Sequence, residues 1–168
     1  TVQWLIDGVP EGSVLCLDEA YSEFAPLGTT PAIDVSNPHV LRFRTFSKAH
    51  GMAGARIGYA IGESELIKSF DKIRNHFGVN RIAQVGALAS LQDPAHLASV
   101  VEKVAAARER IATIARANGL KPLPSAANFV AIDCCNDGAF ARRVLSELID
   151  RDVFVRMPGV SPLDRCIR

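Results

Sequence analysis

An α/β fold is the class that this sequence predicts, with part of a large, mainly parallel sheet domain followed by a smaller α+β unit. Short apolar runs bounded by glycine or charged residues come early in the chain, as in buried parallel strands. Segments with helical periodicity follow, and strand and helix signals then alternate again. We expect the large unit to span residues 1–105 and the small unit residues 106–168, joined by a long helix around 94–118.

Three strands are expected in the first unit. Residues 14–17 are apolar throughout and lie between Gly12 and Asp18, which is typical of a buried parallel strand. In residues 40–46, apolar and polar side chains alternate more than in residues 14–17, and this pattern indicates a second strand. Residues 56–61 lie between two glycines and indicate a third strand.

Helices are expected after these strands. Residues 63–75 carry apolar side chains at helical spacing. Asn80 can cap a helix that runs to about residue 92. A longer helix is expected to begin at Asp93-Pro94 and to end at Asn118-Gly119, where a left-handed cap is favoured. Its predicted apolar face contains Leu97, Val100, Val101, Val104, Ile111 and Ile114.

The second unit shows a strand and helix pattern of its own. Residues 128–133 and 153–156 are the expected strands, and residues 139–150 form the expected helix between them. Residues 165–168 have the pattern of one more strand. Because the chain opens at Thr1 without a methionine and stops within that pattern, we expect a piece of a longer protein.

The overall composition argues against several classes of function. The 168 residues carry a net charge of +1, which does not favour nucleic acid or an anionic membrane as a partner. No uncharged apolar run approaches the ~18 residues of a membrane span. No cysteine or histidine spacing indicates a metal site, so we expect none, and we expect a cytoplasmic protein with reduced thiols. The four cysteines, three of them expected on strands and each expected to be a small buried apolar residue, are Cys16, Cys134, Cys135 and Cys166.

Two segments carry the residues that indicate chemistry. Residues 17–24 read LDEAYSEF, and residues 44–56 read RTFSKAHGMAGAR. Lys48 offers an amine, which at an ordinary pKa of about 10.4 needs neighbouring cations or burial to become a nucleophile at neutral pH. Asp18 ends a predicted strand, where a carboxylate can project into the crevice at the carboxyl edge of a parallel sheet. A buried carboxylate requires an opposite charge, which a ligand can supply.

Further polar groups surround these two residues in the sequence. Tyr21 offers a phenol three residues after Asp18. Thr45 and Ser47 offer hydroxyls, and Arg56 offers a planar guanidinium that binds phosphate in a bidentate way. An amine for an aldehyde, an acid for a pyridine nitrogen, a donor for a ring hydroxyl and a cradle for a phosphate are what pyridoxal 5′-phosphate requires of a protein.

Both segments resemble the signatures of the fold-type-I pyridoxal-phosphate aminotransferases, and among these the histidinol-phosphate aminotransferase group. The eight-residue step from Lys48 to Arg56 matches the family spacing, while His50 stands where the family often has phenylalanine. The resemblance implies Lys48 as the Schiff-base lysine and proton shuttle, Asp18 on the pyridine nitrogen and Tyr21 on the ring oxygen. It also implies that the cofactor phosphate is bound by Thr45, Ser47 and Arg56.

The resemblance extends to the end of the chain. It implies that Arg168 binds the α-carboxylate of the substrate and that Arg156 helps to bind a distal phosphate. It further implies transfer of an amino group between an L-amino acid, or an amine like histidinol phosphate, and a 2-oxo acid. A homodimer is implied as well. This chain corresponds to about half of the family's usual length, so we expect it to be inactive by itself.

Two alternative functions remain open from the sequence. A pyridoxal-phosphate decarboxylase or lyase on the same fold would use the same lysine and aspartate. An aminotransferase-like sensor domain of a transcription regulator would bind the cofactor without turnover. Lys48 and Asp18 alone do not distinguish transamination from either alternative.

Overall fold

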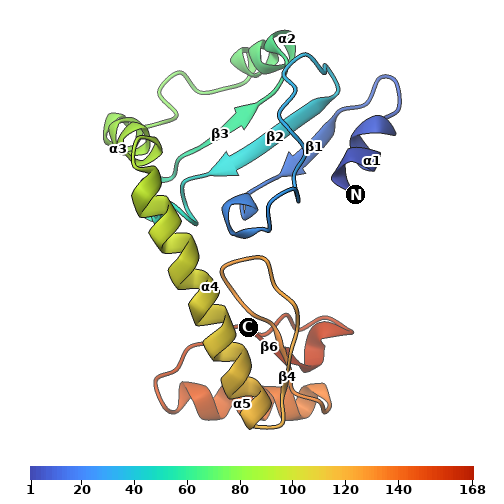
Figure 1. Cartoon of the computed structure of the whole chain (residues 1–168), viewed down its shortest axis with the longest axis vertical. Coiled ribbons are helices and arrows are strands. Elements are labelled where there is room, and N and C mark those ends of the chain that lie inside the picture. The colour runs from blue at the N-terminus through green and yellow to red at the C-terminus, as the bar shows by residue number, and fades with distance from the viewer. The chain divides into compact units, whose positions relative to one another are not determined.

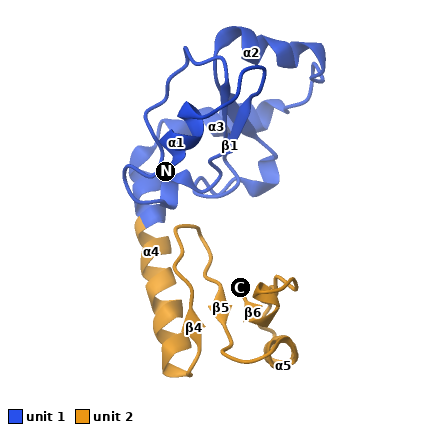
Figure 2. Ribbon diagram, turned by 90° about the vertical axis from the view of Figure 1, so that its right-hand side faces the viewer, with its two compact units in different colours: residues 1–101 blue, residues 102–168 orange.

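The computed structural model describes residues 1–168 and divides into two units, residues 1–101 and 102–168 (Figure 2). The first unit contains a three-stranded sheet in the order β1-β2-β3 (Figure 1). Strands β1 and β2 run parallel, and β2 and β3 run antiparallel. The elements of this unit are α1 (Val2–Asp7), β1 (Leu15–Asp18), β2 (Val40–Thr45), β3 (Gly58–Ile61), α2 (Ser64–Lys68) and α3 (Arg81–Leu91).

The antiparallel pairing of β2 with β3 depends on one glycine. A Cβ atom added at Gly58 would lie 2.7 Å from the carbonyl oxygen of Arg44, so a larger residue would separate the strands. Gly58 pairs with Thr45 in the strand register. The close approach therefore fixes the end of β2, which is the start of the segment that carries Lys48.

The long helix α4 (Pro94–Ala117) continues across the boundary between the two units. The second unit adds β4 (Lys121–Pro122), β5 (Ile132–Asp133), α5 (Gly138–Ile149) and β6 (Cys166–Ile167). Its strands form an antiparallel sheet in the order β4-β5-β6. Its hydrophobic core consists of Cys134, Ala141 and Ile167, with partly buried apolar side chains of α5 packed against them.

Helix ends follow the sequence closely. The side chain of Asn80 accepts a hydrogen bond from the backbone of Ala83, and α3 begins at the next residue. Asp93 accepts one from His96 at the start of α4. Gly119 has a φ of 72°, which confirms the left-handed end of the long helix. Asp137 caps α5 through the backbone of Phe140.

Several expected elements differ from the structure. Strand β3 begins at Gly58 rather than at residue 56, and α1 was not expected from the sequence. The helix expected over 63–75 ends at Lys68 and continues as a 3₁₀ turn, Ser69–Lys72; the Ser69 hydroxyl donates to the carbonyl of Leu66 there. Only Ile132–Asp133 of the strand expected over 128–133 is regular.

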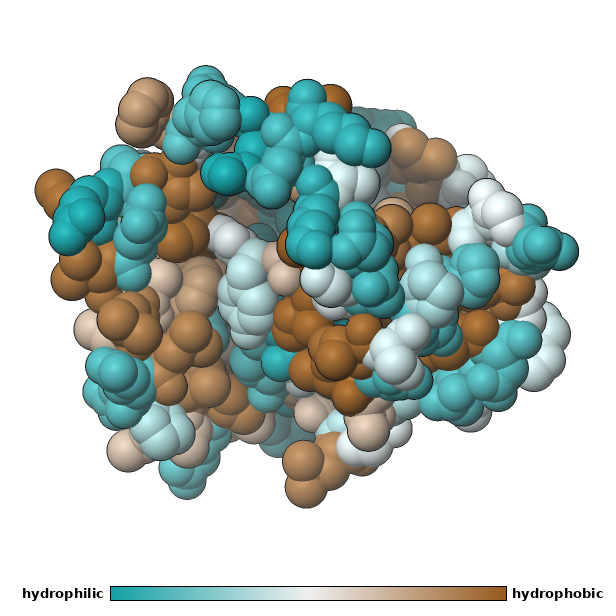
Figure 3. Space-filling view, turned by 90° about the horizontal axis from the view of Figure 1, so that it is seen from above, coloured by the Kyte–Doolittle hydropathy of each residue, from teal (hydrophilic) through white to brown (hydrophobic).

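Burial also departs from expectation in places. Strand β1 alternates, with Leu15 and Leu17 more buried than Cys16 and Asp18, so it is covered on one face only. In α4, Ala112 and Ala115 are buried, while Ile111 and Ile114 of the predicted apolar face are exposed. The exposed surface in Figure 3 accordingly intersperses apolar with polar side chains.

The cysteines are all free, and only two of them lie on strands. Cys16 and Cys135 are exposed, contrary to the expectation of burial. Cys134 follows β5 directly, and Cys166 belongs to β6. Burial raises the pKa of the thiols of Cys134 and Cys166, which keeps both in the neutral form.

Helix α3 presents a stripe of exposed apolar side chains. Its members are three residues apart, so neighbouring members are adjacent while the stripe as a whole winds around about half of the helix surface: Ile82, Val85, Leu88 and Leu91. The opposite side of α3 buries Ala83 and Ala87. No helix of the structure has both the length and the apolar character needed to cross a bilayer.

Candidate active site

A cavity of about 410 Å³ in the first unit brings together five of the residues that the sequence singled out. They come from the end of β1, the end of β2 and the loop after β2. The full lining is Asp18, Ala20, Phe43, Arg44, Thr45, Ser47, Lys48 and Arg56. Asp18 and Arg56 are exposed, whereas Thr45, Ser47 and Lys48 are half-buried, so the cavity is open to solvent on one side.

Asp18 is the last residue of β1, directly opposite Phe43 of β2. Its Oδ1 atom accepts a hydrogen bond of 3.0 Å from the backbone of Ala20, which turns the chain away from the strand. The other carboxylate oxygen stays available to a ligand. The expectation that this carboxylate is buried is wrong for this chain, because β1 is uncovered on the face that carries it.

Lys48 lies in the loop that follows β2. Its Nζ atom is 5.2 Å from the centre of the Tyr21 ring, a distance at which the ring face attracts a cation. The ring is thereby placed beside the lysine, although Tyr21 is not part of the cavity wall. The backbone of Lys48 accepts a hydrogen bond from Gly51, whose φ of 70° makes the tight turn after the lysine.

The three residues expected to bind phosphate lie around the same loop. The Thr45 hydroxyl accepts a hydrogen bond of 3.1 Å from the backbone of Ser47, which holds both residues at the cavity. Arg56 has a left-handed backbone with a φ of 53°, an unfavourable conformation for a residue with a side chain. Its Nη1 atom donates to the carbonyl of Ala53 at 2.8 Å. Strained residues of this kind cluster at ligand sites.

A group of charged residues beside the cavity was not predicted from the sequence. Glu19 is buried between Arg42 and Arg44 of β2; its Oε2 atom is 3.0 Å from Nε of Arg44, and its Oε1 atom is 3.5 Å from Nη1 of Arg42. Burial by itself would lower the pKa of Arg44, but hydrogen bonds with Glu19 and Tyr59 outweigh it and raise that pKa. The available sequence signal was the pair of arginines at alternate positions of one strand. Two such residues share one face of the sheet, and a charged residue that is buried there requires a partner of opposite charge.

Arg156 and Arg168 lie in the second unit and are neighbours there. Their backbones exchange two hydrogen bonds, of 2.9 and 2.7 Å, although residues 153–156 do not form the regular strand that was expected. The guanidinium of Arg168 lies 4.4 Å from the centre of the Phe129 ring. Both arginine side chains are exposed.

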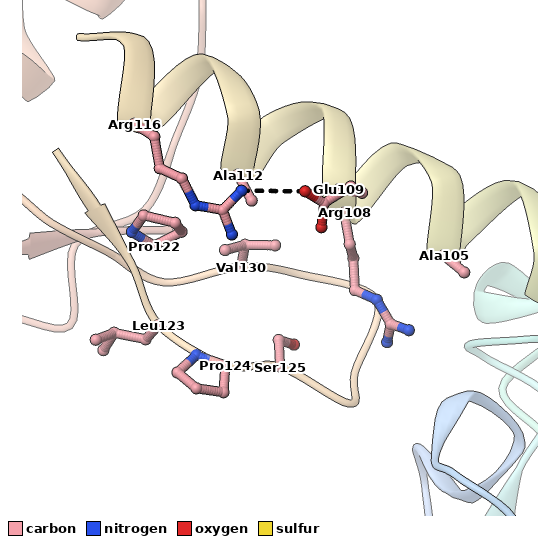
Figure 4. A pocket seen from close by; sticks show the side chains of 10 residues that line it. All are labelled: Ala105, Arg108, Glu109, Ala112, Arg116, Pro122, Leu123, Pro124, Ser125 and Val130. Carbon is pink, nitrogen blue, oxygen red and sulfur yellow. Dashed lines mark hydrogen bonds and ion pairs between the residues drawn. The ribbon is translucent and has the colours of Figure 1, made fainter. Parts of the chain in front are cut away.

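A second cavity, of about 420 Å³, lies between α4 and the segment from β4 to Val130 (Figure 4). Arg116 and Glu109 of α4 form an ion pair of 3.0 Å at its wall. Arg108 also borders it and donates to the carbonyl of Ala127. None of the residues expected to act in catalysis or cofactor binding lines this cavity.

The fold is that of the fold-type-I pyridoxal-phosphate-dependent transferases, as comparison with solved structures shows. A histidinol-phosphate aminotransferase from Sinorhizobium meliloti, solved in complex with pyridoxal 5′-phosphate, has a TM-score of 0.94 and 49% identity; the match covers 99% of this chain and 47% of that protein. An aspartate aminotransferase variant from Thermus thermophilus has a TM-score of 0.69 and 26% identity, covering 92% and 42%.

The family model of aminotransferase class I and II matches residues 1–168, and the chain belongs to this family. A histidinol-phosphate aminotransferase from Roseiflexus castenholzii is 40% identical over 172 residues, which cover 100% of this chain and 45% of the relative. An aromatic amino acid aminotransferase from Mycobacterium avium is 41% identical over 173 residues, covering 97% and 49%. The chain thus spans about half the length of the curated relatives it matches.

Proposed function

We propose that the protein containing this chain is a pyridoxal-phosphate-dependent aminotransferase. It would transfer an amino group between an L-amino acid, or an amine like histidinol phosphate, and a 2-oxo acid. The observation that carries the proposal is the single cavity that contains Asp18, Thr45, Ser47, Lys48 and Arg56. The relatives described above, which are named as aminotransferases, support it.

The residues of the cavity fit this cofactor in number and in chemistry. Asp18 would hold the protonated pyridine nitrogen, and Tyr21 would donate to the ring oxygen. Thr45, Ser47 and Arg56 would bind the phosphate, and Arg56 contributes a fixed positive charge. The strained backbone of Arg56 supports this role, because strained residues are concentrated at ligand sites.

Lys48 would anchor the cofactor aldehyde through Nζ and then act as the general base and acid at the substrate Cα. When bound, the cofactor supplies an electron sink for the bond that breaks at Cα. The contact with the Tyr21 ring supports the placement of Nζ at the cavity. Asp18 keeps the sink effective, because its charge favours the protonated ring.

Substrate binding is assigned to the second unit. We propose that Arg168 binds the α-carboxylate and that Arg156 binds a distal phosphate when the substrate carries one. Their exposed guanidinium groups and paired backbones support this, since both side chains are available to an anion. The first unit would belong to the large domain of the complete protein and the second unit to its small domain.

Two properties of the complete protein follow from the same proposal. We propose a homodimer, and the exposed apolar stripe of α3 supports the burial of this helix against further protein. We also propose a cytoplasmic location, which suits the four free cysteines. The decarboxylase and sensor alternatives have no observation in their favour.

The test is an amino-donor screen with the natural full-length protein. Histidinol phosphate and aromatic L-amino acids serve as donors, 2-oxoglutarate serves as acceptor, and newly formed glutamate is measured. Lys48→Ala should lower the rate by at least about 10³-fold. Lys68→Ala is the matched control, because Lys68 is an exposed lysine paired with Glu65. Release of carbon dioxide without glutamate would overturn transamination.

A further inference from the structure

An ion pair between a buried acid and a half-buried arginine joins the two strands that lead into the proposed cofactor site. Glu19 directly follows Asp18 at the end of β1, and Arg44 directly precedes Thr45 at the end of β2. Nε of Arg44 donates to Oε2 of Glu19 at 3.0 Å. The Glu19 side chain is only 4% exposed, and that of Arg44 is 24% exposed.

Arg44 lies in the middle strand of the sheet, where its register partner in β3 is Tyr59. The backbone of Glu19 donates to the carbonyl of Phe43 at 2.9 Å, so the ladder between β1 and β2 continues to this point. The ion pair of Glu19 and Arg44 therefore adds a side-chain link between β1 and β2 at the end where the cavity lies.

We propose that Glu19 and Arg44 are positioning residues that set the separation of Asp18 from Thr45, and so match the cavity to the ring and phosphate of one ligand. This inference rests on the proposed function. Glu19 does not line the cavity; Arg44 does, but its guanidinium is bound to Glu19, so each residue acts through the neighbour that binds the ligand. A ligand that is bound at both its ring and its phosphate is sensitive to the separation of the residues that bind them. A displacement of about 1 Å in such a site weakens binding or slows the reaction.

Arg42 provides a matched comparison within the same cluster. It is as buried as Glu19 and lies 3.5 Å from the other carboxylate oxygen. Its guanidinium, however, donates to the carbonyls of Pro31 and Ala32, at 2.9 and 3.1 Å, and Arg42 does not border the cavity. Arg42 and Arg44 contact the same acid, Glu19, and lie in the same strand, but Arg42 is more distant from Thr45 in the sequence.

The experiment measures the dissociation constant of pyridoxal 5′-phosphate for the natural full-length protein, by absorbance, well below the unfolding temperature of every variant. Glu19→Gln and Arg44→Gln should each weaken binding about tenfold or more. Arg44→Lys keeps the charge but not the planar geometry, and should weaken binding about threefold. Arg42→Gln should lower the unfolding temperature while changing the dissociation constant by less than about twofold.

The outcomes separate this inference from the proposed function. Unchanged affinity in Arg44→Gln and Arg44→Lys would overturn the positioning role, while wild-type binding would leave the proposed function standing. Equal weakening by Arg42→Gln and Arg44→Gln would also overturn it, since the cluster would then act through stability alone. A folded wild-type protein that does not bind pyridoxal 5′-phosphate would overturn both.

Discussion

The two units place their proposed ligand-binding residues in different ways. In the first unit, Lys48 and its neighbours lie at strand ends or in the loop after them, and these strand ends are joined by the ion pair of Glu19 and Arg44. In the second unit, Arg156 and Arg168 are exposed side chains on extended backbone, joined to each other by two backbone hydrogen bonds. The residues of the proposed cofactor cavity are therefore positioned by side-chain pairs around them, whereas the proposed substrate arginines have few side-chain contacts of their own.

After the loss of Lys48, the largest expected effect is the loss of the carboxylate of Asp18. Asp18→Asn keeps the hydrogen bond to Ala20 but removes the charge that favours a protonated pyridine. We expect kcat to fall about 10²–10³-fold, as for other preorganised electrostatic groups. Asp34→Asn is the control, because Asp34 is exposed and bonded only within its own turn. A decrease of less than threefold for Asp18→Asn would contradict the role.

The next effect concerns the strained backbone of Arg56. Arg56→Gly relieves the left-handed conformation and should stabilise the cofactor-free protein by about 1 kcal/mol. The same change should weaken binding of pyridoxal 5′-phosphate about 10–100-fold, because a charged contact to phosphate is lost. Thermal unfolding and cofactor titration measure the two effects. A glycine variant that binds the cofactor normally would show that Arg56 is not a phosphate ligand.

Substitution of the two arginines of the second unit should affect different classes of substrate. Arg168→Lys should raise the KM for the 2-oxo acid about tenfold, because lysine cannot make the bidentate contact with a carboxylate. Arg156→Lys should raise the KM only for a phosphorylated amine. Steady-state kinetics with both classes of substrate check the pattern. The assignment fails if the two variants affect the same substrates equally.

The smallest effect is expected at His50, where the family often has phenylalanine. The ring centre of His50 lies 4.9 Å from that of Phe46, and Nδ1 is 2.8 Å from the hydroxyl of Ser90 in α3. His50→Phe keeps the ring contact and loses the hydrogen bond, which should cost about 1 kcal/mol of unfolding free energy. Ser90→Ala should cost a similar amount, and the double variant no more than either one. Additive losses would show that the two residues act independently.

Local signals account for what the sequence predicted well. Asn80, Asp93 and Gly119 define helix ends through bonds and backbone conformations that involve only nearby residues. The spacing from Lys48 to Arg56 lies within one loop, so its geometry follows from a short stretch of chain. These features depend little on the rest of the fold.

Non-local contacts explain what the sequence did not predict. The strand expected over 128–133 is short because its partner β4 ends at Pro122 and is soon followed by Pro124, and neither proline has the N–H group needed to extend the ladder. Within residues 153–156, Arg156 pairs with Arg168, while the backbone of Val153 donates to the carbonyl of Leu148 at the end of α5 instead of to a strand. Glu19 was overlooked because its two arginines are more than twenty residues away in the sequence.

The measurement that tests the central proposal most directly is covalent trapping of the cofactor on the natural full-length protein. Pyridoxal 5′-phosphate is added, the linkage is reduced with borohydride, and the modified peptide is identified by mass spectrometry. We predict a phosphopyridoxyl group on Lys48, and no such adduct on Lys68. A folded protein that carries the adduct on another lysine, or carries none, would contradict the assignment of this cavity as the cofactor site.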